Sequence, residues 1–357
     1  MSNIKQGAFQ APLFNFNTKE VSMSNKVLRQ SLSDEVMLTY LEEGLDDMNK
    51  YFPINHIGLE YVISKVGLPL WRIIQIAGFS DSGKTLLSLY IATQFQKFYQ
   101  DKGLVIYIDT ERAFPSDLFL KLGGNKKAIG LVYPKSLEAV FQGIEKLITN
   151  IREEFPKENP ILIIIDSLSL AVEKELEEGS VPVGTYARFL SSQFRRLRSL
   201  LPTWNATLLM VSQNKEKISL TPFGGGVARL GGHAVEFAPV LTLELKRVTE
   251  DKERKHSFVD VKSIYIEVQA TKNHLGYPFR QIVLKFDFDK FQFDEAYNIF
   301  HMLVYLGKIE KRGGWYAYQG KSYRESELLE VLRQDSAIKD ELRKEFQITG
   351  FQSLYQV

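Results

Sequence analysis

The chain of 357 residues contains no cysteine. This absence excludes disulfide bonds and thiolate metal sites, and it fits a reducing compartment. No apolar run approaches the ~18 residues of a membrane-spanning helix, and residues 1–20 lack the apolar core of a secretion signal. We therefore expect a cytoplasmic protein with no membrane partner.

An excess of charge of either sign is also missing. The formal net charge is +2, from 45 basic and 43 acidic residues, so bulk charge points to no class of partner. A nucleic-acid site would have to come from local clusters of Lys and Arg. The 44% of hydrophobic residues predict a globular protein, and the length predicts two or three domains.

The pattern along the chain changes twice. Residues 1–50 are of mixed polarity and predict an N-terminal arm with a helix at Ser33–Met48. Residues 51–294 alternate apolar runs with helical patterns, such as Leu137–Phe155, and predict the core. Residues 295–357 predict a small α+β C-terminal domain in which helices surround an aromatic hairpin.

The core pattern favours an α/β fold with a central, mostly parallel sheet that helices cover on both faces, because the runs are apolar on both sides. Later segments, "FVDVKSIYIEVQATKN" and "FRQIVLKFDFDKF", alternate like antiparallel strands that extend the sheet. The expected strands of the central, mostly parallel sheet are Ile73–Ala77, Leu104–Ile108, Ile161–Ile165, Thr207–Val211 and Val240–Leu245.

The segment "GFSDSGKT" lies between an apolar run and a helical pattern and fits G-x-x-x-x-G-K-[ST]. In such a loop, backbone N–H groups surround a phosphate, Lys84 neutralises its oxygens, and the Thr85 hydroxyl can ligate Mg²⁺. We predict ATP and Mg²⁺ as cofactors; the alternative is a glycine-rich turn that only connects two elements. The expected nucleotide-binding residues are Gly78, Phe79, Ser80, Asp81, Ser82, Gly83, Lys84, Thr85, Leu86 and Asp166.

Two strand ends supply carboxylates. Asp166 follows five apolar residues, which fits a carboxylate that holds Mg²⁺ together with Thr85. Asp109 and Glu111 end another parallel strand at the same sheet edge, where ligands bind. We predict that Glu111 positions the attacking water; an equally consistent interpretation is a carboxylate that caps the next helix.

Basic residues gather in two other places. A predicted helix with a buried stripe (Leu190, Phe194, Leu197, Leu201) presents Arg188, Ser192, Arg195 and Arg198 on another face, and it adjoins a glycine-rich loop, 217–232. This basic face either contacts a nucleic acid together with the loop or is an ordinary solvated face. The C-terminal region carries a second set of basic residues, which form either a nucleic-acid-binding surface or an ordinary soluble surface: Lys308, Lys311, Arg312, Lys321 and Arg324.

The ordered set of motifs resembles the RecA family of strand-exchange ATPases over most of the chain. Each block is weak alone, but their order is that of the family. The blocks are Ile54–Thr85, Tyr107–Phe114, Ile163–Leu170, Leu208–Ile218, Gly231–Arg247, Ala270–Gln281 and Gly307–Lys321.

The resemblance implies an ATP-dependent recombinase that forms helical filaments on single-stranded DNA and pairs it with homologous duplex DNA. It implies that Gln213 senses the nucleotide, that Lys272 reaches a neighbouring subunit's ATP, and that a single-strand-binding protein and a loading mediator are partners. Catalysis would involve Glu111, Lys84, Gln213 and Lys272. The implied DNA contacts are Val183, Arg188, Arg195, Lys217, Ile218, Gly224, Gly225, Gly226, Arg229, Gly231 and Gly232.

The chain also departs from the family's bacterial members. His274 replaces one of two lysines, the acidic tail is absent, and the adenine-stacking tyrosine has no evident counterpart, so that Leu118 or Phe119 would pack there. These departures favour a bacteriophage or mobile-element origin, of the UvsX-like kind, so the expected cytoplasm is that of a bacterial cell or a phage-infected host. Two alternatives stay open: a hexameric helicase or branch-migration motor on the same core, and a DNA-binding paralogue that barely hydrolyses ATP.

Overall fold

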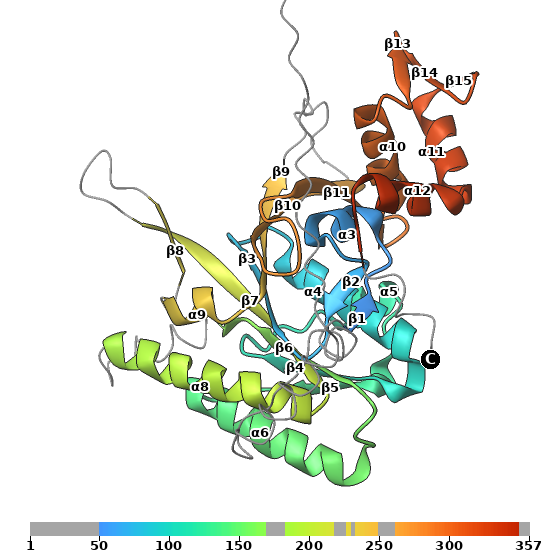
Figure 1. Ribbon diagram of the computed structural model, residues 1–357. Coiled ribbons are helices and arrows are strands. Elements are labelled where there is room, and N and C mark those ends of the chain that lie inside the picture. Colours follow the sequence, from blue (N-terminus) through green and yellow to red (C-terminus); the bar gives the residue numbers. More distant parts are fainter. Residues whose placement is uncertain (1–49, 169–182, 218–225, 230–232, 249–260, 350–357) are drawn as a thin grey trace, which may run out of the picture. The chain divides into compact units, whose positions relative to one another are not determined.

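The computed structural model describes residues 50–168, 183–217, 226–229, 233–248 and 261–349. The predicted arm at 1–49, with its helix, lies outside the described residues. The centre of the described chain is a sheet of ten strands in the order β12-β11-β10-β9-β3-β7-β6-β4-β5, with β8 paired to β7 (Figure 1). The strands are β3 (Ile73–Gly78), β4 (Leu104–Asp109), β5 (Ile129–Val132), β6 (Ile161–Asp166), β7 (Ala206–Lys217), β8 (Gly226–Arg229), β9 (Leu241–Val248), β10 (Ser263–Asn273), β11 (Gln281–Asp287) and β12 (Gln292–Phe293).

The middle of this sheet is parallel, as the apolar runs predict. β3 pairs in parallel with β7 and β9, β6 with β7 and β4, and β4 with β5. The antiparallel extension is confirmed as β9, β10, β11 and β12. Strand β5 was not expected from the sequence, because four residues that include Gly130 provide too short an apolar run.

Alternate residues of the central strands are buried on opposite faces of the sheet, which explains their continuous apolar pattern. Leu162 and Ile164 of β6 pack in the cluster that contains α4 (Lys84–Tyr99) and α3 (Ile57–Ile63). Ile161, Ile163 and Ile165 of the same strand pack in the cluster that contains α6 (Leu137–Glu154) and α8 (Val183–Thr203). The parallel part of the sheet is therefore covered on both sides, as parallel sheets generally are.

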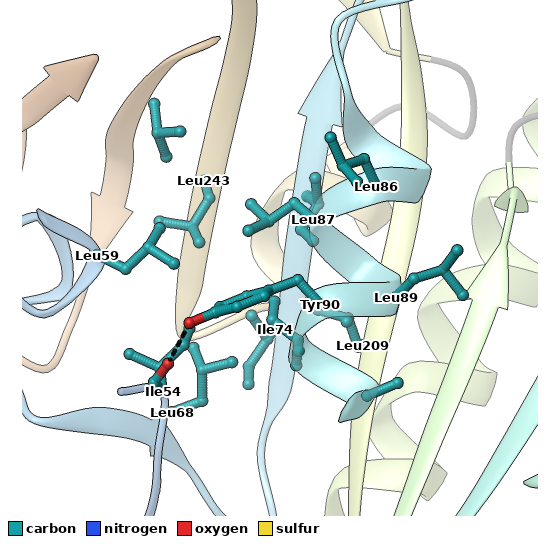
Figure 2. Packing of buried hydrophobic residues seen from close by; sticks show 14 of the residues in the cluster. Ile54, Leu59, Leu68, Ile74, Leu86, Leu87, Leu89, Tyr90, Leu209 and Leu243 are labelled. Carbon is teal, nitrogen blue, oxygen red and sulfur yellow. Dashed lines mark hydrogen bonds between the residues drawn. The ribbon is translucent and has the colours of Figure 1, made fainter. Parts of the chain in front are cut away.

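The core beneath α4 is packed from several segments. Figure 2 shows Tyr90 of α4 among leucine and isoleucine side chains of the surrounding strands and of α3. The Tyr90 hydroxyl donates a hydrogen bond of 2.9 Å to the Ile54 carbonyl (Figure 2), so this buried polar group is satisfied. The shorter elements of the region are β1 (Tyr51–Pro53), β2 (Gly67–Pro69), η1 (Gln100–Lys102), α5 (Ser116–Lys121), η2 (Lys126–Ala128) and α9 (His233–Phe237).

The C-terminal region forms a third apolar cluster, to which α3 contributes Ile57. An antiparallel three-stranded sheet accompanies its helices. The elements are α10 (Glu295–Tyr305), β13 (Glu310–Arg312), β14 (Trp315–Tyr318), β15 (Lys321–Tyr323), α11 (Glu325–Gln334) and α12 (Ala337–Glu345). The division into domains at 50 and 294 stays a prediction. Among the described helices, none has both the length and the apolarity to cross a bilayer.

Candidate functional site

The loop 78–85 joins the end of β3 to the start of α4, the context in which its motif binds phosphate. Gly83 has φ = 94°, and a Cβ there would lie 2.5 Å from the Ile266 Cδ1 atom. A Cβ on Gly78 would lie 2.5 Å from the Leu245 carbonyl oxygen. Only glycine fits both positions, so the backbone of the loop stays in its tight course.

Asp166 lies at the end of β6, and one of its carboxylate oxygens accepts hydrogen bonds from two hydroxyl groups. Thr85 Oγ1 donates to Asp166 Oδ2 at 2.8 Å, and the Tyr107 hydroxyl donates to the same atom at 2.6 Å. Burial raises the pKa of Asp166, while the hydrogen bonds from Tyr107 and Thr85 and the charge of Lys84 oppose that rise. The carboxylate is thus held in one orientation beside the phosphate loop.

Lys84, the first residue of α4, donates a hydrogen bond of 2.5 Å to the Phe79 carbonyl within the loop. Burial lowers the pKa of Lys84, and the carboxylates of Asp166, Asp81 and Glu111 oppose this effect. The ammonium group is therefore partly desolvated, with acidic groups near it. Partial desolvation strengthens the electrostatic attraction between the ammonium group and a bound phosphate.

The two carboxylates at the end of β4 have different contacts: Asp109 is the last residue of the strand, and Glu111 lies two residues beyond it. Asp109 accepts hydrogen bonds from the backbone N–H groups of Glu111 (3.0 Å) and Phe114 (2.9 Å), so it stabilises the turn before α5. Glu111 makes no such turn contact in the described chain; its Oε1 is 3.4 Å from the Ser167 Oγ atom. This arrangement leaves the Glu111 carboxylate at the mouth of the site.

These side chains line two cavities, which share Thr85, Glu111 and Asp166. A cavity of about 410 Å³ is lined by Ser80, Asp81, Gly83, Lys84, Thr85, Leu86, Glu111, Leu118, Asp166, Ser167, Gln213, Arg247, Ile264 and Phe288. A smaller cavity of about 70 Å³ is lined by Thr85, Tyr107, Asp109, Glu111, Ala113, Phe114, Pro115 and Asp166. The first has the size of a small-molecule site, and the second is large enough and polar enough for water.

The structure decides between the two residues expected at the base-binding end. Leu118 lines the larger cavity, whereas Phe119 is only 2% exposed and belongs to the apolar core. The expectation that Phe119 could pack against the base is wrong, because its ring packs against Gly124 and Phe114. The sequence assigned no site role to Tyr107, Arg247, Ile264 and Phe288. Tyr107 and Arg247 lie at the ends of blocks that resemble the family but carry no motif role there, and the other two lie in none of the blocks.

Gln213 lies in β7 directly opposite Gly78 of β3 and lines the larger cavity. A buried network fixes the strand next to it: Gln75 Nε2 donates to Ser212 Oγ at 2.6 Å, and Thr242 Oγ1 donates to Gln75 Oε1 at 3.2 Å. Three adjacent strands are thereby joined one residue before Gln213.

The expected loop at 217–232 is partly a strand, which corrects the sequence interpretation. β8 (Gly226–Arg229) pairs in antiparallel fashion with Asn214–Lys217, so β7 and β8 form a two-stranded ribbon (Figure 1). Glycine-rich composition concealed this pairing, because glycine has a low strand propensity. The other expected DNA contacts of this segment, Ile218, Gly224, Gly225, Gly231 and Gly232, lie outside the described residues.

On α8, the buried stripe is confirmed, and Arg188 and Arg195 are exposed. Arg198 differs: its guanidinium donates to the carbonyls of Phe237 (2.7 Å) and Ala238 (2.9 Å) at the end of α9. It therefore stabilises the fold instead of belonging to a free basic face. Val183 is the first residue of the helix.

Lys272 of β10 contacts the same end of α9. Its Nζ atom lies 3.1 Å from each of the Glu236 and Phe237 carbonyl oxygens, with the ring of Phe237 5.9 Å away. Lys272 does not line the cavity that holds Lys84.

Part of the C-terminal basic surface is paired internally. Lys308 forms ion pairs with Glu341 and Glu345, and Arg312 forms one with Glu310. Arg324 stacks over the ring of Trp315 at 4.1 Å. The net positive charge available to a phosphate backbone is therefore smaller than the sequence suggests.

Comparisons with known proteins identify the same family that the sequence motifs resemble. The model of the RecA N-terminal domain family matches residues 23–291. Protein RecA of Mycoplasma genitalium is 28% identical over 294 residues, which cover 81% of this chain and 82% of that protein. Protein RecA of Aquifex pyrophilus is 29% identical over 295 residues, covering 78% of each chain. Protein RecA of Thermus aquaticus is 27% identical over 300 residues, covering 82% of this chain and 83% of the relative.

Proposed function

The chain belongs to the RecA family, and from this membership we infer that it is an ATP-dependent recombinase with DNA-dependent ATPase activity. Family membership also implies nucleotide binding, DNA binding and self-association. The hexameric helicase and branch-migration alternative is not favoured by these relatives. The arrangement that carries the proposal is the convergence of Lys84, Thr85, Asp166 and Glu111 on one cavity beside Gln213.

We propose that the nucleotide is ATP with Mg²⁺, and the residues present fit this group. The loop holds a buried Ser82 hydroxyl that has no hydrogen-bond partner among the described residues, and a phosphate oxygen would satisfy it. Thr85 and Asp166 supply the oxygen atoms that Mg²⁺ prefers. When bound, the cation would neutralise charge on the phosphate oxygens.

Each residue of the chain then has a role that its position supports. Lys84 and the loop N–H groups bind the phosphates, and Thr85 and Asp166 hold the cation. Glu111 orients a water molecule, since it lines the small cavity as well as the large one. Leu118 and the apolar side chains of Ile264 and Phe288 supply a surface for the base.

Self-association would complete the site. We propose that Lys272 acts on the nucleotide of an adjacent copy, which fits its absence from the cavity of its own chain. A head-to-tail contact of this kind generates an open helical filament. Gln213 would report the nucleotide to the DNA-binding segment, because β7 continues from Gln213 into the β7–β8 ribbon.

We further propose that the ribbon and the exposed Arg188 and Arg195 bind the phosphate backbone of single-stranded DNA. Such contacts carry no sequence information, so any sequence is accepted and base pairing with homologous duplex DNA selects the partner. A single-strand-binding protein and a loading mediator are further proposed partners. The identities of 27–29% to the bacterial proteins leave room for a bacteriophage or mobile-element origin, which we also propose.

The test is ATP hydrolysis with and without single-stranded DNA, with electron microscopy of the same samples in a slowly hydrolysed ATP analogue. We expect DNA-stimulated hydrolysis and helical filaments. The matched control is K84A, which should lose both because it removes the phosphate-binding cation. Closed rings, or hydrolysis that is indifferent to DNA, would instead support a motor, and an ATP-bound protein without turnover would support the non-catalytic paralogue.

A further inference from the structure

A buried tyrosine beside the proposed cation site is not explained by the phosphate-binding motif. Tyr107 lies in β4, is 1% exposed, and stands opposite Ile164 of β6 in the sheet. The Phe114 ring packs edge-on against it, with ring centroids 4.9 Å apart. A phenylalanine would fill this apolar position equally well, so the hydroxyl has to be explained by its own contact.

That contact is with the carboxylate that we assign to cation binding. The Tyr107 hydroxyl is 2.6 Å from Asp166 Oδ2, and Thr85 Oγ1 donates to the same oxygen at 2.8 Å. No hydrogen bond to Asp166 Oδ1 occurs within the described part of the chain. The two hydroxyl protons thus fix the rotation of the carboxylate about its last bond.

The direction of the hydrogen bond on Thr85 follows from this arrangement. Because the Thr85 hydroxyl donates its hydrogen bond to Asp166, the lone pairs of Oγ1 remain available to a cation. This orientation of the hydroxyl persists only if the accepting oxygen of Asp166 stays in one position. Tyr107 supplies the second, more rigid contact, because its ring is enclosed by the sheet and by Phe114.

We propose that Tyr107 is a positioning residue, which acts through Asp166 to orient the Thr85 hydroxyl for Mg²⁺ in the nucleotide complex. This inference rests on the proposed Mg²⁺–ATP site. Outer groups that orient metal ligands commonly change metal affinity by about 10–100-fold.

The experiment measures how strongly Mg²⁺ strengthens nucleotide binding. The dissociation constant of a fluorescent ATP analogue is determined in EDTA and in saturating Mg²⁺ for the wild type, Y107F and Y90F. The ratio of the two constants is the readout. Y90F is the matched control: it removes another buried tyrosine hydroxyl, whose partner is the Ile54 carbonyl (Figure 2) and not a residue of the proposed cation site.

We expect the ratio to fall about tenfold in Y107F and to stay at the wild-type value in Y90F. Equal ratios in Y107F and Y90F would overturn the proposal. So would a Y107F protein that loses affinity equally in EDTA and in Mg²⁺, because the hydroxyl would then support the loop and not the carboxylate. A wild type that binds no nucleotide, or binds it without regard to Mg²⁺, would overturn the proposed site itself.

Discussion

The ion pair between Glu60 and Arg343 predicts a large and pH-dependent effect of one substitution. Glu60 of α3 is 1% exposed, and Arg343 of α12 binds it with both ends of the guanidinium: Nε to Oε2 at 2.7 Å and Nη2 to Oε1 at 2.9 Å. The pair joins residues 283 positions apart in the sequence. It therefore connects the C-terminal helices to the first helix of the core.

Replacing Arg343 by Met keeps most of the side-chain volume and leaves Glu60 buried without its partner. Breaking a buried pair in this way costs about 3–5 kcal/mol, whereas removing both charges is often nearly neutral. At an unfolding entropy of about 2.1 cal/mol/K per residue, over the roughly 300 residues from 50 onward, 4 kcal/mol corresponds to a fall in Tm of about 6 °C. The matched control is E60Q with R343M, which removes both charges and should recover most of the loss.

The sign of the pH dependence follows from Glu60. Burial raises its pKa in the folded protein, although Arg343 opposes the rise, and loss of Arg343 must raise it further. A carboxyl group whose pKa is higher in the folded state contributes stability at low pH and loses it as the pH rises through that folded value. The penalty of R343M is therefore largest at pH 8 and smaller at pH 5.

Denaturant unfolding of the full chain, followed by circular dichroism at both pH values, measures the effect. A change below about 1 kcal/mol at pH 8 is the range of an exposed ion pair and would refute the assignment of a buried one. A penalty in R343M that does not shrink between pH 8 and pH 5 would refute Glu60 as its source. A double variant as unstable as R343M would point to lost packing by the arginine stem.

Two further predictions concern catalysis. E111Q should reduce DNA-stimulated kcat by about 10²–10⁴-fold, because the amide cannot accept a proton from water, while the dissociation constant for ATP stays within error; unchanged turnover would show that Glu111 has another role. K272A should lose DNA-stimulated hydrolysis, and mixing it with K84A should restore part of the rate, since some subunit interfaces would then pair an intact loop with an intact Lys272; no recovery at any mixing ratio would place Lys272 in its own subunit's chemistry.

The sheet could be predicted from the sequence because its central strands are buried on both faces. Ile161–Ile165 is continuously apolar for that reason, and both sides of β6 are covered by helices. The strands that escaped prediction lack this signal. Ile129–Val132 is at the sheet edge and contains a glycine, and β8 begins with one. Their pairing depends on a neighbouring strand, which local composition does not record.

The nucleotide site divides in the same way. The position of the loop could be predicted because its residues are contiguous, and the positions of Asp166 and Glu111 beside it could be predicted because parallel strands end at one edge of the sheet. Tyr107 could not: its role arises from a contact with a residue 59 positions away. Phe288 belongs to an antiparallel extension whose distance from the loop no spacing rule specifies.

The contacts of the cationic side chains give a more general reason for this limit. Lys84 donates to the carbonyl of Phe79, Arg198 to that of Phe237, and Lys272 to that of Glu236. Every residue has such a carbonyl, so the identity of the acceptor leaves no trace in the sequence. It follows that substituting the acceptor side chains leaves the hydrogen-bonding groups in place, and only a change in the cation tests these contacts. The proposed trans role of Lys272 must accordingly be tested by changing the lysine, since side-chain substitution cannot remove the two carbonyls that bind it in its own chain.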